Sequence, residues 1–206
     1  MADLAQAIPR TREDFRALLL AATGFAPQRL RQDAPFVADW LETPIGPLIT
    51  ISSTAGLHIM EFPERRALPG ELRRLLGVTS ALAIGRTAPS EQAAHNMELY
   101  FSGQDPALDM PLAPQGTAFE RAHWDALRDI PAGTTRTYAA MAEALGRAGA
   151  FRAVGRANGA NPVAIAIPCH RLVGKDGALT GYGGGLWRKR WLLDHEAKHY
   201  GGQHGR

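Results

Sequence analysis

Residues 165–173 read Ile-Ala-Ile-Pro-Cys-His-Arg-Leu-Val, and this stretch decides how the rest of the chain is interpreted. It contains Cys169, the only cysteine among 206 residues, between a proline and a histidine. A free cysteine is most often a small buried apolar side chain. It becomes a strong nucleophile when a base or positive surroundings favour the thiolate. Both hypotheses, inert core residue and nucleophile, stay open on this stretch alone.

The residues just before Cys169 predict a rigid support for it. Valine or isoleucine alternates with alanine over residues 163–167, the pattern of a short buried strand that the following proline ends. Neighbouring side chains of an extended chain point to opposite faces, so we expect a bridging water between Cys169 and His170. A carboxylate would then orient the imidazole. The preferred candidate is Glu196, which lies on a helix predicted over residues 186–196. The other candidates are Asp194 and Asp176.

A helix that carries two arginines is predicted over residues 150–160. Its two glycines cost about 1 kcal/mol each relative to alanine, which makes sense where another molecule must approach the backbone. Tight packing against a second helix is the alternative, but a nucleic-acid groove suits the arginines better because they bind phosphate. At 100° per residue, the outer face holds Arg152, Gly155, Arg156 and Gly159, and the inner face holds Ala150, Ala153, Val154 and Ala157.

Composition indicates a globular protein of one or two domains, since 45% of the residues are hydrophobic and 21% are charged. Apolar runs are too short for a membrane span, and the N-terminus lacks the pattern of a signal peptide. A single cysteine permits no intramolecular disulfide and no cysteine cluster for zinc. We therefore expect a reduced, cytoplasmic protein that contains no metal and contacts no membrane.

Charge is distributed unevenly along the chain. Residues 1–112 contain 10 Lys+Arg and 13 Asp+Glu, a net charge of −3, whereas residues 113–206 contain 13 and 7, a net charge of +6. A basic C-terminal half suggests an anionic partner, of which DNA is the commonest. An ordinary solvated basic surface explains the charge equally well.

The chain divides into four predicted segments: a helical leader over residues 1–35, an α/β domain over 36–112, a DNA-binding and transfer domain over 113–198, and a tail over 199–206. Residues 15–31 of the leader loosely resemble the end of an AraC-type helix-turn-helix. Nothing in residues 36–112 indicates chemistry. Residues 112–117 are the predicted linker because they contain Pro114 and Gly116.

Secondary structure follows from periodicity and capping residues. The predicted strands of the α/β domain are 36–41, 48–51 and 56–62, and its helices are 71–76 and 90–101. A leader helix is predicted over 14–22, ending near Gly24. Beyond the linker, helices over 119–127, 138–145 (with Thr137 as N-cap) and 150–160 outline a helix-turn-helix.

Residues 167–173, preceded by Arg152-Ala153-Val154-Gly155 and Asn161-Pro162, resemble the O6-alkylguanine-DNA alkyltransferases, also called methylated-DNA–protein-cysteine methyltransferases. The resemblance covers residues 114–197, and residues 43–48 resemble the start of the family's N-terminal domain. Its further motifs are Phe119 with Trp124, Ile130-Pro131-Ala132-Gly133 with Tyr138, Gly177 with Gly181-Tyr182, and Lys189 with Leu192-Leu193 and Glu196. Ala148, where proline is common, and the bulky Phe151 depart from the pattern.

The resemblance implies an α+β protein with a small ribonuclease-H-like N-terminal domain and a C-terminal winged helix-turn-helix. Such proteins bind the minor groove of double-stranded DNA containing O6-alkylguanine and flip the damaged base out of the stack. The implied activity is irreversible transfer of the alkyl group from O6-alkylguanine, and from O4-alkylthymine, to Cys169. It needs no cofactor and consumes the protein in one turnover, and a monomer is expected.

The resemblance also implies roles for individual residues. In the reaction, Cys169 is the nucleophile and alkyl acceptor, His170 the water-mediated base and Glu196 the residue that orients it. Tyr138 donates to the base and crowds the target phosphate, and Lys189 donates near the cysteine loop. On the DNA side, Arg152 enters the stack, and Gly155, Arg156 and Gly159 complete the binding face. Asn161 joins the recognition helix to the active-site segment, while Val173, Tyr182 and Gly183 belong to the base pocket.

Two other functions compete with this one. A DNA-binding or regulatory protein of the same fold without transfer activity accounts for the basic helix-turn-helix and the AraC-like leader. A Cys-His hydrolase accounts for the Cys169–His170 pair, but the sequence contains no oxyanion signature. The preferred alkyl group depends on the width of the pocket, which the loop around Tyr182 sets.

Overall fold

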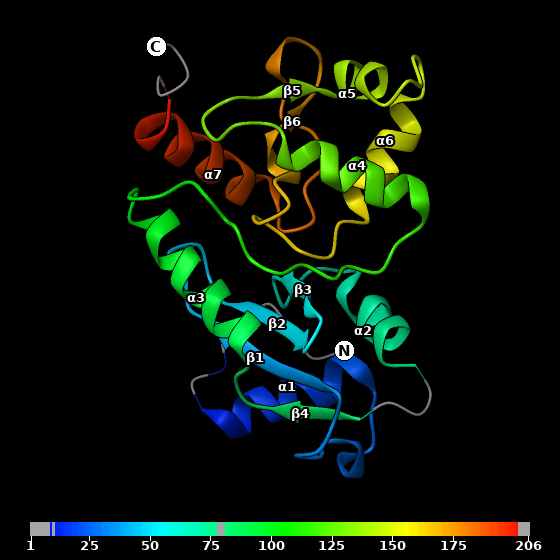
Figure 1. Cartoon of the computed structure of the whole chain (residues 1–206), viewed down its shortest axis with the longest axis vertical. Helices are drawn as coiled ribbons and strands as arrows, with labels where there is room; N and C mark the ends of the chain where they lie inside the picture. The colour runs from blue at the N-terminus through cyan, green and yellow to red at the C-terminus, as the bar shows by residue number, and fades with distance from the viewer. Residues whose placement is uncertain (1–8, 10, 78–80, 202–206) are drawn as a thin grey trace.

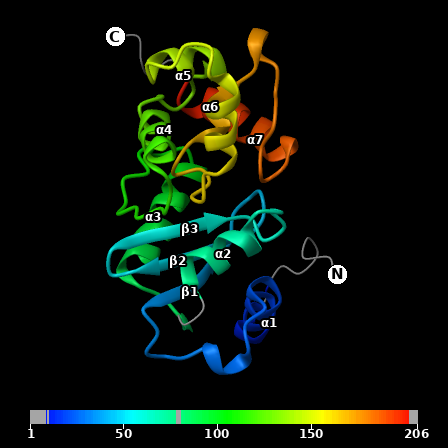
Figure 2. The same ribbon diagram turned by 90° about the vertical axis from the view of Figure 1, so that its right-hand side faces the viewer.

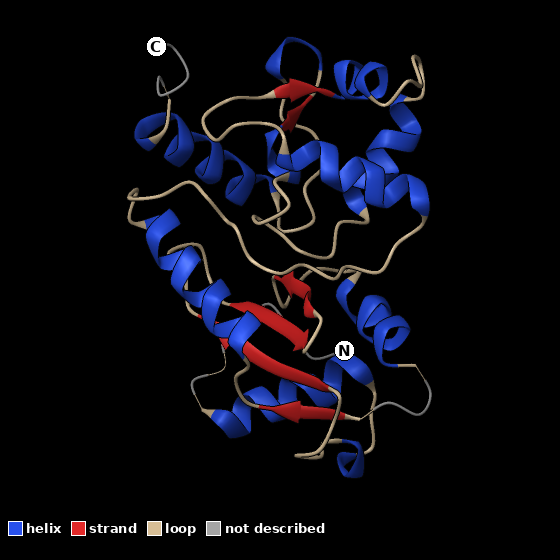
Figure 3. Cartoon of the chain, viewed as in Figure 1, coloured by secondary structure: helices blue, strands red, loops and turns tan. Residues whose placement is uncertain are grey.

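Four strands form the sheet of the N-terminal half in the computed structural model, which describes residues 9, 11–77 and 81–201. The strand order is β3-β2-β1-β4, with β1, β2 and β3 antiparallel and β4 parallel to β1 (Figure 3). The three predicted strands are confirmed, whereas the short β4 was not predicted. The strands are β1 (Phe36–Leu41), β2 (Leu48–Ser53), β3 (Gly56–Glu61) and β4 (Leu82–Ile84).

Helices cover both faces of this sheet (Figures 1 and 2). Side chains alternate between the faces of a strand, so Ile49 and Ile51 of β2 pack with α1 and α2, whereas Leu48 packs with α3. Gly24 caps α1 in the left-handed conformation, as predicted. Phe15 and other apolar side chains of α1 are buried against the sheet. The helices are α1 (Arg12–Thr23), α2 (Leu68–Leu76) and α3 (Ala88–Phe101).

The C-terminal half is mainly helical. Thr117 starts α4 with a reciprocal capping box to Glu120, and Thr137 caps α5 as predicted. Both α4 and α5 pack against α6, and β5 pairs in parallel with β6. The elements are α4 (Ala118–Arg128), β5 (Arg136–Thr137), α5 (Tyr138–Ala144), α6 (Phe151–Gly159), β6 (Leu172–Val173) and α7 (Leu186–His199). Short 3-10 turns lie at Pro27–Arg29, Cys169–Arg171 and Lys175–Gly177.

The two halves meet along β3 and share a hydrophobic core (Figure 1). Met60 of β3 donates its N–H to the carbonyl of Pro162 at 2.9 Å, and its carbonyl accepts from Ala164 N at 2.7 Å. The predicted linker is a loop, but it is bound to the same strand, since Ala113 N donates to Leu57 O at 2.9 Å. The segment before Cys169 is thereby anchored on the N-terminal sheet.

Two predictions about residues 150–167 were wrong. Residues 163–167 form a tight turn and no strand: Ile167 N donates to Val163 O at 3.0 Å, and Ile165 has a φ of 70°. All five side chains are buried, so their alternation in size did not report alternation between two faces. In α6, Val154 and Ala157 are buried as predicted, but Ala153 is exposed. Ala153 lies at the edge of the predicted inner face, because the part of the helix that packs inward is narrower than the predicted face.

None of the helices within residues 11–77 and 81–201 combines the length and apolarity that crossing a membrane requires. Parts of the predicted leader (residues 1–8 and 10) and of the predicted tail (202–206) lie outside the described residues.

Candidate active site

Cys169 opens onto a cavity of about 420 Å³ where the two halves meet. The cavity brings together Cys169 and six other residues predicted for the site, namely Tyr138, Gly155, Gly159, Asn161, Tyr182 and Gly183. Its other lining residues are Glu61, Arg65, Asn158, Thr180, Gly181 and Gly184.

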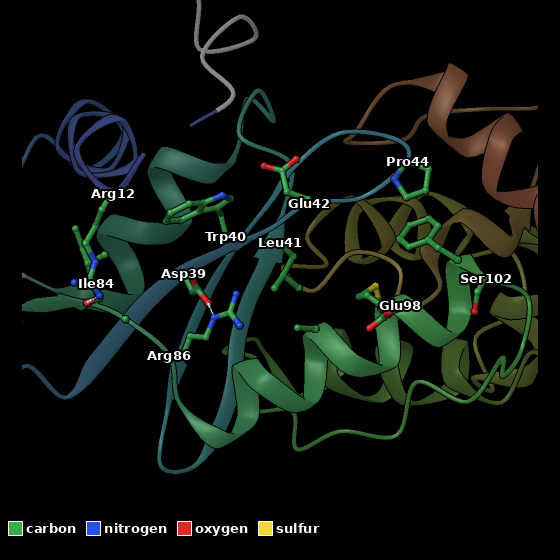
Figure 4. A pocket seen from close by; sticks show the side chains of 14 residues that line it. Arg12, Asp39, Trp40, Leu41, Glu42, Pro44, Ile84, Arg86, Glu98 and Ser102 are labelled. Carbon is green, nitrogen blue, oxygen red and sulfur yellow. Dashed lines mark hydrogen bonds and ion pairs between the residues drawn. The ribbon is translucent and has the colours of Figure 1, made fainter. Parts of the chain in front are cut away.

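A larger hollow, of about 820 Å³, lies in the N-terminal half between β1 and α3 (Figure 4). Its lining includes Trp40, Leu41 and Phe101 and an ion pair between Arg86 and Asp39, but neither a cysteine nor a histidine. Size therefore does not identify the reactive site, and the smaller cavity contains the reactive group.

A short helical turn presents Cys169 to the cavity. Residues 169–171 form one turn of 3-10 helix, so the extended chain assumed for Cys169 and His170 was wrong. Asn161 stabilises the preceding turn, because its Nδ2 donates to Ile167 O at 2.8 Å and its Oδ1 accepts from Val163 N at 2.9 Å. Asn158 Nδ2 donates to the carbonyl of Cys169 at 3.3 Å. Two amides thus fix the backbone on either side of the thiol.

The surroundings of Cys169 keep its thiol protonated at neutral pH. Burial raises the pKa of Cys169 to about 11, against a hydrogen bond from Asn161 that favours the thiolate. Nearby Glu61 raises this pKa further, whereas Arg65 and Lys189 lower it. Reaction as a thiolate therefore requires a base that removes the proton.

His170, next to Cys169 in the same turn, is the residue predicted as the base. It is fully buried, and its Nε2 lies 2.8 Å from Glu196 Oε1. A carboxylate can only accept, so Nε2 carries the hydrogen and Nδ1 of the neutral ring has a free lone pair. Nδ1 is buried and has no protein partner among the described residues. Burial lowers the pKa of His170, which keeps the ring neutral and able to accept a proton at Nδ1.

Glu196 on α7 is the carboxylate that orients His170, whereas Asp194 and Asp176 are exposed. Burial by itself would raise the pKa of Glu196, but His170 and Arg171 hold it well below its usual range. Arg171 Nε and Nη2 donate to the carboxylate at 2.9–3.2 Å. The Glu196 carboxylate also accepts from Gly133 N at 3.1 Å and from the Tyr100 hydroxyl at 2.7 Å.

Lys189 and Tyr138 lie close to each other, with the Lys189 ammonium 6.0 Å from the centre of the Tyr138 ring. The Lys189 ammonium is fully buried and donates to the carbonyls of Leu172 and Thr180, at 2.5 and 2.8 Å. Burial lowers the pKa of Lys189 to about 8. Lys189 therefore joins the cysteine segment to the glycine-rich loop. Tyr138 is the first residue of α5, and its hydroxyl accepts from Asn158 Nδ2 at 3.5 Å.

The predicted DNA-binding face of α6 is open to solvent. Arg152 and Arg156 are exposed, and a Cβ added at Gly155 or Gly159 would meet no atom within 4 Å outside the helix itself. The inner face is held by Trp124, whose Nε1 donates to Ala157 O at 2.9 Å. The two arginines thus flank a shallow helix surface that leads into the cavity of Cys169.

Besides Asn161, three residues were predicted for the hinge and base pocket, and two of them line the cavity. Tyr182 and Gly183 line the cavity, and the Tyr182 hydroxyl is buried without a protein partner in the described part of the chain. Val173 is buried in β6, paired with Thr137 of β5, and does not line the cavity. Its contribution is to the backbone frame behind the thiol.

Glu61 and Arg65 line the cavity although residues 36–112 gave no indication of chemistry. Arg65 Nη1 donates to Glu71 at 2.6 Å and lies 3.3 Å from Glu61 Oε2, and Nη2 donates to Gly159 O at 2.6 Å. Burial raises the pKa of Glu61 to about 7. These positions depend on how the two halves pack, which no local pattern encodes. Asn158, a buried polar residue of α6 that was not predicted for the site, also lines the cavity.

A metal site is not evident in this part of the molecule. Residues 9, 11–77 and 81–201 contain no group of three or more His, Cys, Asp or Glu side chains that could hold an ion. His58 is engaged with Ser53 and with the carbonyl of Ala113, both at 2.7 Å.

Comparison with known proteins agrees with this geometry. The family described as 6-O-methylguanine DNA methyltransferase, DNA binding domain, matches residues 118–198. A methylated-DNA–protein-cysteine methyltransferase of Methanosarcina barkeri is 44% identical over 155 residues, covering 75% of this chain and 93% of the relative. The protein of the same name from Salmonella typhimurium is 41% identical over 162 residues, covering 76% and 92%.

Solved structures show the same similarity. The O6-methylguanine methyltransferase of Mycobacterium tuberculosis has a TM-score of 0.69 and 38% identity, with 80% of this chain and 94% of that chain covered. The OGT of the same organism in complex with DNA has a TM-score of 0.67 and 36% identity, covering 80% and 93%. With this identity over most of its length, the chain belongs to the methylated-DNA–protein-cysteine methyltransferase family.

Proposed function

We propose that this protein repairs DNA by direct reversal, transferring the alkyl group of O6-alkylguanine, and of O4-alkylthymine, irreversibly to Cys169. The observation that carries the proposal is the single cysteine at the wall of a cavity, with a neutral, carboxylate-bound histidine next to it. Transfer to the protein's own thiol leaves a stable thioether, so each molecule acts once. Family membership supports the transfer chemistry, and the Cys169–His170–Glu196 arrangement speaks against a non-catalytic DNA-binding protein.

The reaction is an in-line displacement at the alkyl carbon. The sulfur of Cys169 forms a bond to that carbon as the bond from the carbon to O6 of guanine breaks. The thiol proton passes through a water molecule to Nδ1 of His170, and the guanine anion that is released takes up one proton from the Tyr138 hydroxyl. Tyr138 lines the cavity. Its phenolate regains a proton from the protonated His170 through solvent, so both residues return to their neutral forms. Atoms and charge balance without a cofactor or a metal.

The proton route follows from the electrostatics of the site. Burial raises the pKa of the Cys169 thiol to about 11, so attack and proton removal must be coupled. Glu196 remains ionised and stabilises the imidazolium that forms when His170 accepts the proton. Lys189, held by two carbonyls, keeps positive charge near the developing thiolate.

DNA binds, in this proposal, with its minor groove on α6. Arg152 takes the place of the flipped nucleotide, and Arg156 binds phosphate. Gly155 and Gly159 let the backbone approach closely, since no side chain covers them. Tyr138 crowds the target phosphate, and the flipped base enters the cavity between Tyr182 with Gly183 and Asn161. Phe151, 52% exposed, stands beside the inserting arginine.

The domain organisation completes the proposal. The strand order β3-β2-β1-β4 with a parallel outer strand supports a ribonuclease-H-like domain over residues 36–112. The packing of α4 and α5 on α6 supports a winged helix-turn-helix over residues 113–198. The protein acts as a cytoplasmic monomer, and α1 of the predicted leader packs against the sheet of the α/β domain.

A titration of the protein with excess duplex tests this function. Duplex containing O6-methylguanine is incubated with a known amount of protein, and restored guanine is measured by chromatography after digestion. We expect restored guanine to stop at one equivalent per molecule of active protein. Continued turnover would favour a hydrolase, and the absence of product at DNA concentrations that saturate binding would favour a regulatory protein.

A further inference from the structure

Tyr100 links the N-terminal half to the carboxylate behind Cys169. It lies in the last turns of α3, the end that reaches α7 in Figure 1. Its hydroxyl donates to Glu196 Oε1 at 2.7 Å, and both side chains are fully buried. The same oxygen accepts from His170 Nε2 at 2.8 Å. A residue 96 positions away in sequence therefore shares one oxygen atom with the proposed base.

The phenol ring is fixed in this position from its backbone side. The carbonyl of Tyr100 accepts from His195 Nε2 at 2.9 Å and from the Tyr200 hydroxyl at 2.7 Å. The rings of His195 and Tyr200 pack against the Tyr100 ring with centroid separations of 5.3 and 5.9 Å. The hydroxyl of Tyr100 thus points at Glu196 in a packed environment that offers it little freedom to turn away.

The titratable groups around this hydrogen bond come from several elements. They are Glu196, His195 and Lys189 of α7, Tyr200 after it, His170 and Arg171 of the cysteine turn, and Tyr182 of the glycine-rich loop. Burial, followed by the charge of Glu196, raises the pKa of Tyr100 well above its usual value. Tyr100 consequently stays a neutral donor wherever His170 titrates.

We propose that Tyr100 is a positioning residue for alkyl transfer, which holds the carboxylate of Glu196 and limits how strongly it stabilises protonated His170. Each hydrogen bond donated to a carboxylate spreads its negative charge and weakens its pull on other donors. Without the Tyr100 hydroxyl, Glu196 Oε1 attracts the imidazolium more strongly, and His170 holds its proton up to a higher pH. The inference rests on the proposed function of Cys169 as alkyl acceptor.

Tyr100→Phe tests this role, with Tyr200→Phe as the matched control. Both variants remove one buried hydroxyl from the same cluster, but only Tyr100 donates to Glu196. The rate of Cys169 alkylation by free O6-benzylguanine is measured against pH. We expect Tyr100→Phe to move the midpoint of the acidic limb up by about 0.5–1 pH unit, or about 3- to 10-fold in rate on that limb. Tyr200→Phe leaves the midpoint in place.

The outcomes separate positioning from simple structural support. A structural role alone lowers the fraction of active protein, which scales the profile without moving it. An unchanged or lowered midpoint in Tyr100→Phe, or an equal shift in Tyr200→Phe, overturns the inference. Site-specific 3,5-difluorotyrosine at position 100 covers the case in which Tyr100→Phe does not fold. Its more acidic phenol is a stronger donor, so the midpoint should move down, and any other result contradicts the role.

A second probe keeps this test separate from that of the proposed function. Cys169 is the only cysteine, so the pH dependence of iodoacetamide alkylation reports on its thiolate without any guanine. A wild-type protein that ignores O6-benzylguanine and alkylated duplex contradicts the proposed function. The iodoacetamide profiles of wild type, Tyr100→Phe and Tyr200→Phe then still show whether the midpoint of the acidic limb rises in Tyr100→Phe alone, as the role of Tyr100 requires.

Discussion

Replacing Glu196 by glutamine keeps the shape of the side chain and removes the charge on which the buried network depends. Arg171 would lose its charged partner at 2.9–3.2 Å and remain buried, and the donors that face Glu196, His170 Nε2 among them, would compete for the single acceptor oxygen of the amide. Breaking one side of a buried ion pair costs about 3–5 kcal/mol of unfolding free energy. For a chain of this size, that corresponds to a fall in Tm of about 6–20 °C.

The loss should depend on pH with a predictable sign. The folded protein holds the pKa of Glu196 well below its usual range, so its contribution is complete above the unfolded pKa, about 4.3, and declines as pH falls. Urea unfolding of wild type and Glu196→Gln at pH 7 and pH 3 measures this. The exposed Asp194→Asn, on the same helix, is the control and should change stability by less than about 0.5 kcal/mol. A difference below about 1 kcal/mol at pH 7, or one that is the same at pH 3, would mean that the charge of Glu196 does not stabilise the buried network.

Three further changes address the DNA face, the pocket loop and the buried lysine. Arg152→Ala should slow repair of duplex by about tenfold or more and leave reaction with free O6-benzylguanine nearly unchanged; equal effects would contradict an intercalating role. Gly183→Ala should slow both reactions because its Cβ would lie 2.7 Å from an atom of the buried Arg65. Gly181→Ala should slow neither, because a Cβ there meets nothing within 4 Å. Similar rates for the two variants would show that Gly183 does not form a wall of the base pocket. Burial lowers the pKa of Lys189 to about 8 in the folded protein, against about 10.4 in the unfolded chain. The unfolded chain therefore binds more protons between about pH 8 and 10, so the stability of wild type relative to Lys189→Met should rise with pH over this range. A difference in denaturation midpoint that does not change with pH would argue against a buried ammonium.

Local patterns predicted most elements of the fold because caps and periodicity act within one element. Gly24 and Thr137 ended and began their helices as predicted, and the three long strands followed from their apolar pattern. The turn at residues 163–167 was mistaken for a strand, since a segment buried on all sides carries no period. The three-residue β4 was too short to show one.

The same distinction between local patterns and long-range packing applies to the residues of the site. Cys169 and His170 are adjacent in sequence, and Glu196 was the preferred carboxylate, on the helix predicted over residues 186–196, so their meeting could be predicted. Tyr100 and Arg65 could not, because they reach the site only through packing of one half on the other. The N-terminal half is therefore more than a support: it contributes a pocket wall and a donor to the buried carboxylate.

Peptide mass spectrometry shows whether Cys169 itself receives the alkyl group. Wild-type protein is incubated with duplex containing O6-methylguanine, digested and compared with Cys169→Ser treated in the same way. We predict a gain of one methyl group, confined to the peptide that contains Cys169 and absent from the variant. A methyl group on any other residue, or restored guanine with an unmodified Cys169, would contradict the account.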